Sequence, residues 1–430
     1  MMRGGLVLVS IVGKGIHKVA HEAPKSTSVP SSLLITTFGW NPALARWLRE
    51  NSDTFVLIQT RIPYGYNGTR PGPIQYRRFS KGTTVASFEV GTKFQALFSS
   101  VARISALFLQ VAFDLVTMVV VLRSETRFDC VISTNLNPFL PLLRGITQRL
   151  ILVSGDNYIP IQSDVDVAKN RGRFKLVLSG CASYAVVAID RLLQDSATEV
   201  WYLSKRLFKA KTQTGSRTRS GVAKKIVPLA TSYVECESQE KKFKHSVVYL
   251  GRVSEGHGLE ETIVAMKEVI TTFPSATLHL LGGGRPSYFE KLRRIAEQLG
   301  ISNAVVVYGY VPNERLTEEV LYSYMSRFSV AIAIYTHPQI GYTDPGKVKD
   351  YLSSGLPIIA STNIEIAKEI VTESAGIGVD ATPDSIAASI KAILSVESDS
   401  SKFRAGARTL AAKYDYKRVY GKALADPGYS

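Results

Sequence analysis

The sequence contains little cysteine, and its cysteines form no recognisable framework. Its 430 residues include three of them, Cys130, Cys181 and Cys236, an odd number placed far apart along the chain. That spacing fits neither a set of disulfides nor a zinc site, and it favours a reducing compartment. We therefore expect a cytoplasmic protein.

Long hydrophobic runs are also scarce. The apolar run from Leu6 to Val12 is short and ends at Gly13, which disfavours a secretory signal. The longer run at 104–122 contains Gln110 and Asp114, and an aspartate near the centre of a span costs about 2.5–3.5 kcal/mol on insertion. We interpret this run as a buried or half-buried helix of a first domain, with an interfacial position as the alternative.

Two signatures of other enzyme classes are missing. The turn after the first predicted strand reads FGWNP and lacks the Gly-x-Gly-x-x-Gly that brings backbone to a dinucleotide. A nicotinamide dehydrogenase is therefore the weakest interpretation. We find no DxD-like cluster placed to hold a metal, and we expect the protein to need neither a metal nor another cofactor.

Positive charge is present in excess. Lys and Arg number 52 against 36 Asp and Glu, which gives a formal net charge of +16. Such a field attracts polyanions, including nucleotide sugars and anionic lipid headgroups. Residues 202–225 concentrate part of it and contain no acid, and we interpret the C-terminal half of this segment as a mobile surface loop. A solvated loop and an anionic-membrane contact are equal alternatives, whereas nucleic acid is disfavoured because no binding motif accompanies the charge.

Length and patterning predict two domains of the α/β class. Apolar strands alternate with helical segments through the first half, and the pattern restarts near residue 247. Such strands predict parallel sheets that are covered by helices on both faces, which is a doubly wound, Rossmann-like arrangement. We place an N-terminal extension at 1–30, domains at 31–235 and 236–412, and a C-terminal tail at 413–430. Ligands of such sheets bind beyond the carboxyl ends of the strands, so we expect the site in a cleft between the domains.

The expected elements can be given by residue. In the first half we predict strands at 32–38, 54–59, 128–133, 149–154 and 199–204, and a helix at 43–50. In the second half we predict strands at 247–250, 276–281, 305–308, 330–334 and 358–360, and helices at 259–271, 287–299, 316–325, 347–353 and 383–394.

Loops of suitable chemistry follow four of the second-half strands. The first contains Gly251, Arg252 and His257; glycine lets backbone approach an anion, and an arginine can bond two phosphate oxygens. The next two are Gly282-Gly283-Gly284-Arg285 and Gly309-Tyr310-Val311-Pro312, and the fourth spans 341–357. Each loop alone also fits an ordinary turn. Their succession at strand ends of one sheet favours a binding site.

The fourth loop predicts the start of a helix. Asp344 suits the N-cap and Pro345 the first helical position. The free N–H groups around Gly346 and Lys347 would form an anion site, and Asp350 could accept hydrogen bonds from ribose hydroxyls. An ordinary surface helix with a solvated face is the alternative.

Together these motifs resemble the donor domain of the retaining GT-B glycosyltransferases of group 1, the family 4 class, over residues 244–412. The stretches that carry the resemblance are YLGRVSEGHGLEE, LHLLGGG, VVVYGYVP and DPGKVKDYLSSGLPIIAS. The first half is similar to the acceptor domain only loosely, through its first strand-turn-helix and RLILVSGDNYIP. The resemblance implies GT-B architecture, with an acceptor-side domain first and a donor-binding domain second.

The resemblance also implies roles for individual residues. Arg252 would bind the diphosphate, and Asp350 would take the place of the ribose-binding carboxylate. Two positions depart from the family: His257-Gly258 replaces a Lys-Gly pair, and Tyr342 replaces a glutamate that contacts the transferred sugar. The predicted catalytic residues are Arg252, Lys347 and Tyr342. The predicted donor-binding residues are Gly39, Gly251, Arg252, His257, Gly282, Gly283, Tyr310, Val311, Gly346, Lys347 and Asp350.

The activity implied by the resemblance is transfer of a sugar from a nucleotide diphosphate sugar to a glycan or lipid-linked acceptor. Retention and independence of metal are implied with it, and the departing phosphate would deprotonate the acceptor. A place on the inner face of the membrane, as a peripheral protein, would suit the basic charge. A catalytically silent nucleotide-binding subunit of a membrane glycosylation complex and a nucleotide-sugar epimerase are the alternatives.

Overall fold

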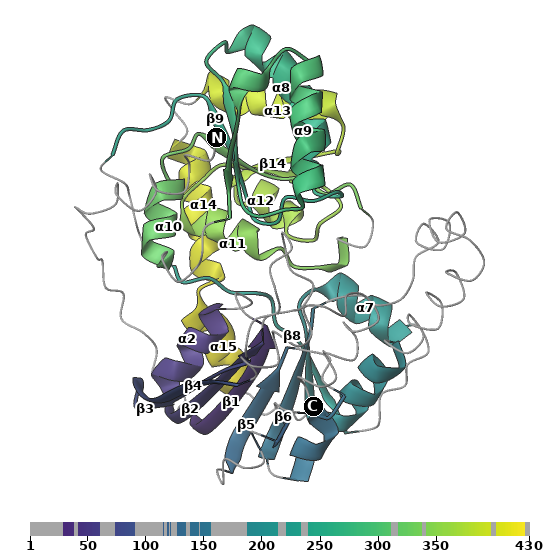
Figure 1. Ribbon diagram of the computed structural model, residues 1–430, viewed down its shortest axis with the longest axis vertical. Coiled ribbons are helices and arrows are strands. Elements are labelled where there is room, and N and C mark those ends of the chain that lie inside the picture. Colours follow the sequence, from purple (N-terminus) through teal and green to yellow (C-terminus); the bar gives the residue numbers. More distant parts are fainter. Residues whose placement is uncertain are drawn as a thin grey trace. The chain divides into compact units, whose positions relative to one another are not determined.

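The structure is a computed structural model of the chain (Figure 1). It describes residues 29–37, 42–60, 74–90, 115, 118–119, 121, 127–134, 138–145, 147–155, 187–213, 221–233, 240–310, 317–337, 341–396 and 401–425. Predictions that fall on other residues, including those for Gly39 and Val311 and most of the run at 104–122, lie outside this description.

The described residues belong to two units. The second unit contains residues 229–419, and the first contains the described residues before 229 together with 420–425. The chain thus divides between 228 and 229, whereas we predicted a division between 235 and 236. Helix α14 (Ser401–Lys413) ends where the predicted tail begins, and the described part of that tail contains helix α15 (Tyr416–Ala425).

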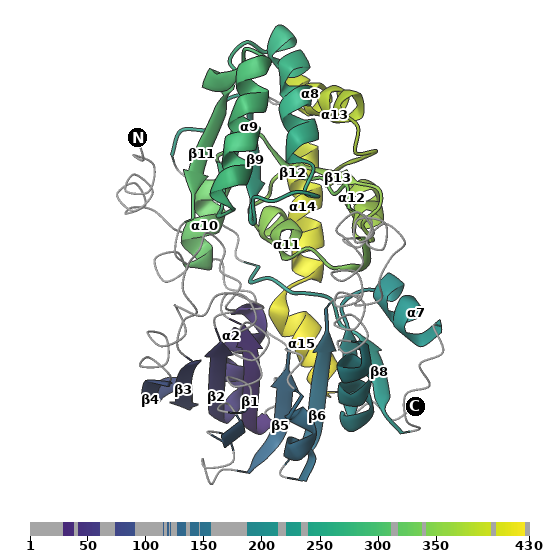
Figure 2. The ribbon, with the colours of Figure 1, turned by 45° about the vertical axis from the view of Figure 1, so that its right-hand side comes forward.

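The first unit contains an eight-stranded sheet in the order β4-β3-β2-β1-β5-β6-β7-β8 (Figure 2). Its parallel strands are β1 (Val29–Thr37), β2 (Ser52–Thr60), β5 (Phe128–Ser133), β6 (Thr147–Ser154), β7 (Glu199–Tyr202) and β8 (Ala223–Ile226). Strand order reverses between β1 and β5, as in a doubly wound sheet. Helix α2 (Pro42–Asn51) begins one residue before the predicted helix, at a proline, whose missing N–H needs no partner in the first turn.

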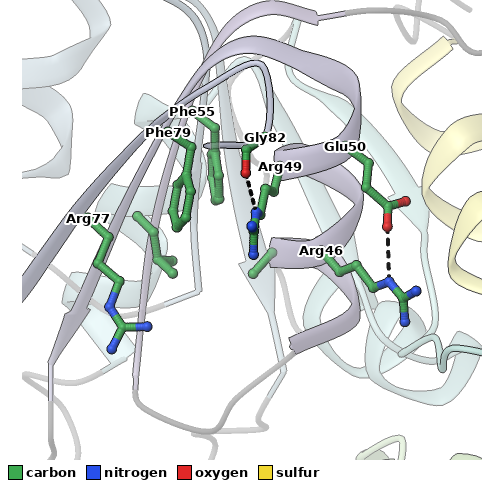
Figure 3. Close-up of a pocket in the computed structure, with 9 residues that line it drawn as sticks. Arg46, Arg49, Glu50, Phe55, Arg77, Phe79 and Gly82 are labelled. Carbon is green, nitrogen blue, oxygen red and sulfur yellow. Dashed lines mark hydrogen bonds and ion pairs between the residues drawn. The ribbon is translucent and has the colours of Figure 1, made fainter. Parts of the chain in front are cut away.

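An antiparallel hairpin extends one edge of this sheet, and the sequence interpretation missed it. Strands β3 (Ile74–Ser80) and β4 (Thr83–Val90) are joined by Lys81 and Gly82, whose φ angles of 44° and 77° suit a tight two-residue turn. Phe79 of β3 stacks on Phe55 of β2 with ring centroids 5.5 Å apart. Arg49 of α2 donates to the Gly82 carbonyl at 2.8 Å and lies over the Phe79 ring (Figure 3). The stacking of Phe79 on Phe55 and the contacts of Arg49 therefore hold the hairpin against β2 and α2.

The basic segment 202–225 contains helix α7 (Lys205–Gln213) in its first half. In the second half, which we expected to be a loop, β8 begins at Ala223, and residues 214–220 lie outside the described part of the chain. Lys211 is buried, with its ammonium 2.9 Å from Asp190 and 2.7 Å from the Ser154 hydroxyl. Lys225 lies 3.0 Å from the buried carboxylate of Glu199. Part of the positive charge of this segment is therefore paired inside the first unit.

The second unit contains a six-stranded, wholly parallel sheet in the order β11-β10-β9-β12-β13-β14. The strands are β9 (Ser246–Leu250), β10 (Thr277–Leu281), β11 (Val305–Gly309), β12 (Val330–Ala333), β13 (Ile358–Ser361) and β14 (Gly376–Val379). The helices are α8 (Leu259–Thr272), α9 (Pro286–Gln298), α10 (Glu318–Met325), α11 (Gly346–Ser353), α12 (Ala367–Thr372), α13 (Pro383–Ser395) and α14. Every strand and helix predicted for this half is present, and β14, α12 and α14 are additional.

Helices cover both faces of this second sheet (Figure 1). Val247 and Tyr249 of β9 point to the face that is packed by α8, α9 and α13. Val248 points to the opposite face, which α11, α12 and α14 cover. This alternation explains why β9 is hydrophobic on both faces from Val247 to Leu250.

Little of the apolar run at 104–122 is described. Its described helical residues, from 115 to 121, divide by exposure: Met118 and Val121 are buried, whereas Leu115 and Val119 are exposed. In the part of the chain that the structure describes, no helix is both long enough and apolar enough to cross a bilayer.

Candidate active site

Four predicted site residues come together at one place in the second sheet. The order of strands reverses between β9 and β12, and the carboxyl ends of two such strands border the usual ligand site of a doubly wound sheet. The loop after β9 carries Arg252 and His257. The segment after β12 leads into α11, which carries Lys347 and Asp350. The four residues thus lie at the switch point of the second sheet.

The glycines of the site shape its backbone. Gly251 donates its N–H to the Leu281 carbonyl and Val253 donates to the Gly283 carbonyl, both at 2.8 Å. Gly282 has a φ of 151°, and a Cβ there would lie 1.7 Å from the Gly251 carbonyl oxygen. The Gly282–Gly284 tract is therefore needed so that two strand-end loops can pair backbone to backbone. We predicted direct donor contacts for Gly282 and Gly283. In the structure, these glycines allow the loops after β9 and β10 to pair.

Gly258 serves the start of α8. It is the N-cap residue in a left-handed conformation, with a φ of 63°. A Cβ at this position would lie 2.2 Å from Cγ2 of Ile334, directly after β12. The glycine thus lets the first turn of α8 approach the end of β12 and brings His257 to the site.

Lys347 lies over the loop after β9. Its Nζ donates to the Tyr249 hydroxyl at 2.6 Å and lies 4.0 Å from the centre of that ring and 5.5 Å from the Tyr335 ring. A Cβ on Gly251 would come within 3.2 Å of the Lys347 Cε, so glycine leaves the space that the lysine side chain needs. Burial lowers the pKa of Lys347 to about 7, against a smaller opposing effect of Asp350.

His257 is held beside this lysine. Its Nδ1 lies 3.1 Å from the Ser254 hydroxyl, and its ring packs against Tyr335 with centroids 5.6 Å apart. Burial first, and then the charge of Lys347, lower the pKa of His257 to about 4. The imidazole is therefore neutral near pH 7, and it can donate a hydrogen bond to phosphate without adding charge.

Asp350 occupies the next turn of α11. The Tyr322 hydroxyl donates to its carboxylate at 3.4 Å, and Thr231 links Tyr322 to Ser353 through bonds of 2.7 and 3.0 Å. Burial, followed by the charge of Glu318, raises the pKa of Asp350 to about 7. The carboxylate is positioned by a network that reaches across the second unit from residue 231.

The start of α11 differs from the prediction. The N-cap residue is Pro345 and the helix begins at Gly346, so Asp344 does not cap it. Asp344 instead accepts from the Leu229 N–H at 2.7 Å and pairs at 2.6 Å with Lys349, whose side chain is 1% exposed. No side chain caps the N-terminus of α11, and Gly346 is exposed there. These are the conditions under which a helix N-terminus can bind an anion.

Two further predicted residues, Tyr310 and Tyr342, lie in the segments after β11 and before α11. Tyr310 follows β11 and is 56% exposed. The Gly309 carbonyl before it accepts from the Gly282 N–H at 3.1 Å, which puts the end of β11 beside the glycine tract. Tyr342 is half-buried in the segment that leads into α11.

Two site tyrosines were missed from the sequence. Tyr249 and Tyr335 flank Lys347, and both are buried. The end of β13 anchors Tyr335: its N–H donates to the Ser361 hydroxyl at 3.0 Å, and Asn363 donates to its carbonyl at 2.8 Å. Both tyrosines lie at or just after apolar strands, where they are typical core residues, and only their place at strand ends could have marked them.

Two cavities lie away from this site. One, of about 550 Å³, is in the first unit between α2, β2 and β3, and it is lined by Arg49, Arg77 and Phe79 among others (Figure 3). The other, of about 430 Å³, is lined by residues 241–244 with His279 and Arg327. Residues 241–244 precede β9, so this second cavity is at the opposite, amino edge of the sheet.

Comparison with known proteins identifies the domain that carries the site. Residues 244–396 match the family model of the glycosyl transferases group 1. This part of the chain is a glycosyl transferases group 1 domain. The matched range contains Arg252, His257, Lys347 and Asp350. No curated protein matches the chain.

Solved structures extend the likeness to the architecture of the whole chain. Sucrose-phosphate synthase from Thermosynechococcus elongatus aligns with a TM-score of 0.58 at 14% identity, over 92% of this chain and 97% of that one. HepE from Anabaena, in complex with UDP, aligns with a TM-score of 0.56 at 13% identity, over 92% and 98%. TarM from S. aureus aligns at 0.52 and 14% over 70% of this chain, which spans 55% of TarM. The two parallel-sheet α/β domains of the GT-B fold, predicted from the sequence, are confirmed.

Proposed function

We propose that this glycosyltransferase takes its sugar from a nucleotide diphosphate sugar bound at the carboxyl ends of β9 and β12. The observation that carries the proposal is the position of Lys347, at the uncapped N-terminus of α11 and directly over the Gly251 backbone. Arg252 follows in the same loop and is exposed. A cation, an arginine and free helix N–H groups are together the partners that a diphosphate requires.

The state of Lys347 supports this assignment. Its pKa of about 7 means that burial opposes the charge while no anion is bound. A diphosphate beside the amine favours the ammonium form, so binding is expected to take up a proton near neutral pH. The charge that develops on the leaving diphosphate is then met by a group already in place.

We further propose that transfer proceeds with retention and without metal. The bond between the anomeric carbon and the phosphate oxygen breaks, and the acceptor oxygen bonds the same face of that carbon. The acceptor's proton passes to the departing phosphate. Lys347, Arg252 and the start of α11 stabilise the negative charge, and neutral His257 donates a hydrogen bond. Asp350 accepts from the ribose hydroxyls.

The acceptor is proposed to be a glycan or a lipid-linked glycan. One structure with the same fold is WaaG, a glycosyltransferase involved in lipopolysaccharide biosynthesis. The exposed basic residues Lys205, Arg206 and Lys209 of α7 would supply a contact with an anionic membrane surface. Flotation with vesicles of neutral or anionic lipid tests that contact: anionic vesicles should carry the protein and neutral ones should not, and equal behaviour rejects it.

A thermal-shift screen tests the donor site. The purified protein is heated with UDP, GDP or ADP and with their sugars, in EDTA and in Mg²⁺. A ligand at about 100 times its Kd should stabilise the native state by roughly 2.7 kcal/mol. A shift with one base in EDTA supports a metal-independent donor site. No shift with any of them, from folded protein, rejects the site, and conversion of donor without acceptor would indicate an epimerase.

A further inference from the structure

The hydroxyl of Tyr249 joins two parts of the proposed diphosphate site. Tyr249 is the fourth residue of β9, and its side chain is fully buried. The hydroxyl donates to the carbonyl oxygen of Arg252 and accepts from Nζ of Lys347 at 2.6 Å. The ring itself lies 4.0 Å from the same Nζ. A single side chain thus touches the loop that carries the arginine and the lysine of α11.

Packing alone does not require this hydroxyl. The ring fills the core between β9 and the helices α8, α9 and α13, and a phenylalanine would fill the same space. A buried tyrosine needs one partner for its hydroxyl, and the Arg252 carbonyl already supplies it. The bond from Lys347 is additional, and it fixes the direction of a long flexible side chain.

We propose that Tyr249 is a positioning residue that holds Lys347 and the Arg252 loop at one fixed separation, so that both meet the same diphosphate. This inference rests on the proposed function of the site. Without the hydroxyl, the Nζ of Lys347 still lies over the face of the ring, but it loses the only hydrogen bond that it makes to the described residues. Its ammonium would then adopt several positions, which costs affinity for the diphosphate.

The hydroxyl also bears on the charge of Lys347. The groups that face this lysine are Asp350 from its own helix, Arg252 and His257 from the loop after β9, Tyr249 from β9, and Tyr335 after β12. An acceptor that bonds an ammonium favours the charged form. Replacing Tyr249 with phenylalanine should therefore lower the pKa of Lys347 further and move the loss of diphosphate affinity to lower pH.

The test compares Y249F with wild type by calorimetric titration of UDP and of inorganic pyrophosphate between about pH 5.5 and about pH 8.5. We expect Y249F to bind both about tenfold more weakly near neutral pH, with the alkaline loss of affinity at lower pH. Y414F is the matched control, because Tyr414 is another buried tyrosine of this unit and its hydroxyl bonds Glu369 at 3.1 Å. It should bind like wild type.

A double-mutant cycle separates positioning from a structural effect. If Tyr249 acts through Lys347, Y249F has a smaller effect on affinity in a K347M background than in wild type, and the remainder comes from the Arg252 loop. A uniform loss of affinity with an unchanged pH midpoint, or an equal loss in both backgrounds, overturns the inference.

Competitive amine labelling, read by mass spectrometry, follows the titration of Lys347 without any ligand. The labelling midpoint should fall in Y249F, and an unchanged midpoint overturns the inference even if no nucleotide binds. Failure of wild type to bind UDP, GDP, ADP and pyrophosphate would instead reject the proposed function.

Discussion

Lys347 carries an amine whose charge depends on what is bound beside it. Because its pKa in the free protein is about 7, the ammonium is lost as pH rises through that value. A bound diphosphate raises the pKa, so affinity for UDP should be high below about pH 7 and should fall above it. K347M should bind about ten- to a hundredfold more weakly at pH 6 and show no such fall. Calorimetry across pH measures both, and K267M, which alters an exposed lysine of α8, serves as control. A fall that persists in K347M would assign the titration to another group.

Replacement of Arg252 tests a second residue of the proposed diphosphate site. Its side chain is exposed, so its removal should leave the fold intact. If it meets the leaving diphosphate, R252A should lower kcat/KM by about 10²- to 10³-fold, and R252K should recover part of this, since lysine cannot form the paired bonds of a guanidinium. Steady-state kinetics with the donor found in the screen gives the numbers. R294A, at an exposed arginine of α9, is the matched control, and near-normal kinetics in R252A would remove the assignment.

At the scale of elements, the site depends on backbone that only glycine allows. A Cβ on Gly282 would lie 1.7 Å from the Gly251 carbonyl oxygen, so G282A must push apart the loops after β9 and β10. We expect a loss of about 2 kcal/mol or more in the free energy of unfolding, together with weaker UDP binding. Urea denaturation and calorimetry measure the two effects.

The control for G282A is a glycine with the same sign of φ and free space. Gly300 has a φ of 73° and nothing within 4 Å of an added Cβ. G300A should cost only about 1 kcal/mol, because the left-handed backbone alone opposes it, and should leave UDP affinity unchanged. Equal stability losses in the two variants would show that the contact with Gly251 gives way easily.

Elements with a continuous apolar pattern could be predicted from the sequence, and alternating ones could not. Five of the six strands of the second unit lie within two residues of prediction, because each is an apolar run bounded by glycine or polar residues, whereas β14, which contains two glycines, was missed. Strands β3 and β4 form the antiparallel edge of the first sheet and mix polar with apolar residues. Their hydrophobic pattern is therefore weaker than that of a parallel strand buried on both faces. The sequence also indicated that Arg252, His257, Lys347 and Asp350 would meet, because parallel strands end at one edge.

Contacts distant in sequence account for what the sequence interpretation missed in the site. Asp344 reads as an N-cap, yet its carboxylate is taken by Lys349 and by the N–H of Leu229, which is 115 positions away. Tyr249 reads as a core residue, and its bond to Lys347 spans 98 positions. No local sequence pattern predicts a hydrogen bond between residues so far apart in the chain.

At the scale of the whole molecule, helix α15 begins in the second unit and ends in the first. The Tyr416 N–H donates to Thr231 of the second unit at 2.9 Å. Further along, Tyr420 stacks on Trp201 of β7, and Arg149 of β6 donates to the Leu424 carbonyl at 2.7 Å. The chain therefore uses its C-terminal helix to complete the core of its N-terminal unit.

Y420A should consequently destabilise the first unit and spare the second. Tyr420 is 1% exposed, and loss of a buried aromatic side chain costs about 3–5 kcal/mol. The two described tryptophans, Trp47 and Trp201, belong to the first unit, so their fluorescence follows its unfolding while UDP affinity follows the second unit. We expect the fluorescence transition of Y420A to move to lower urea concentration with UDP affinity unchanged. K422A, an exposed position of the same helix, should change neither. A loss of UDP affinity that parallels the fluorescence transition would mean that the two units unfold as one, because stability lost at α15 then reaches the donor site as well.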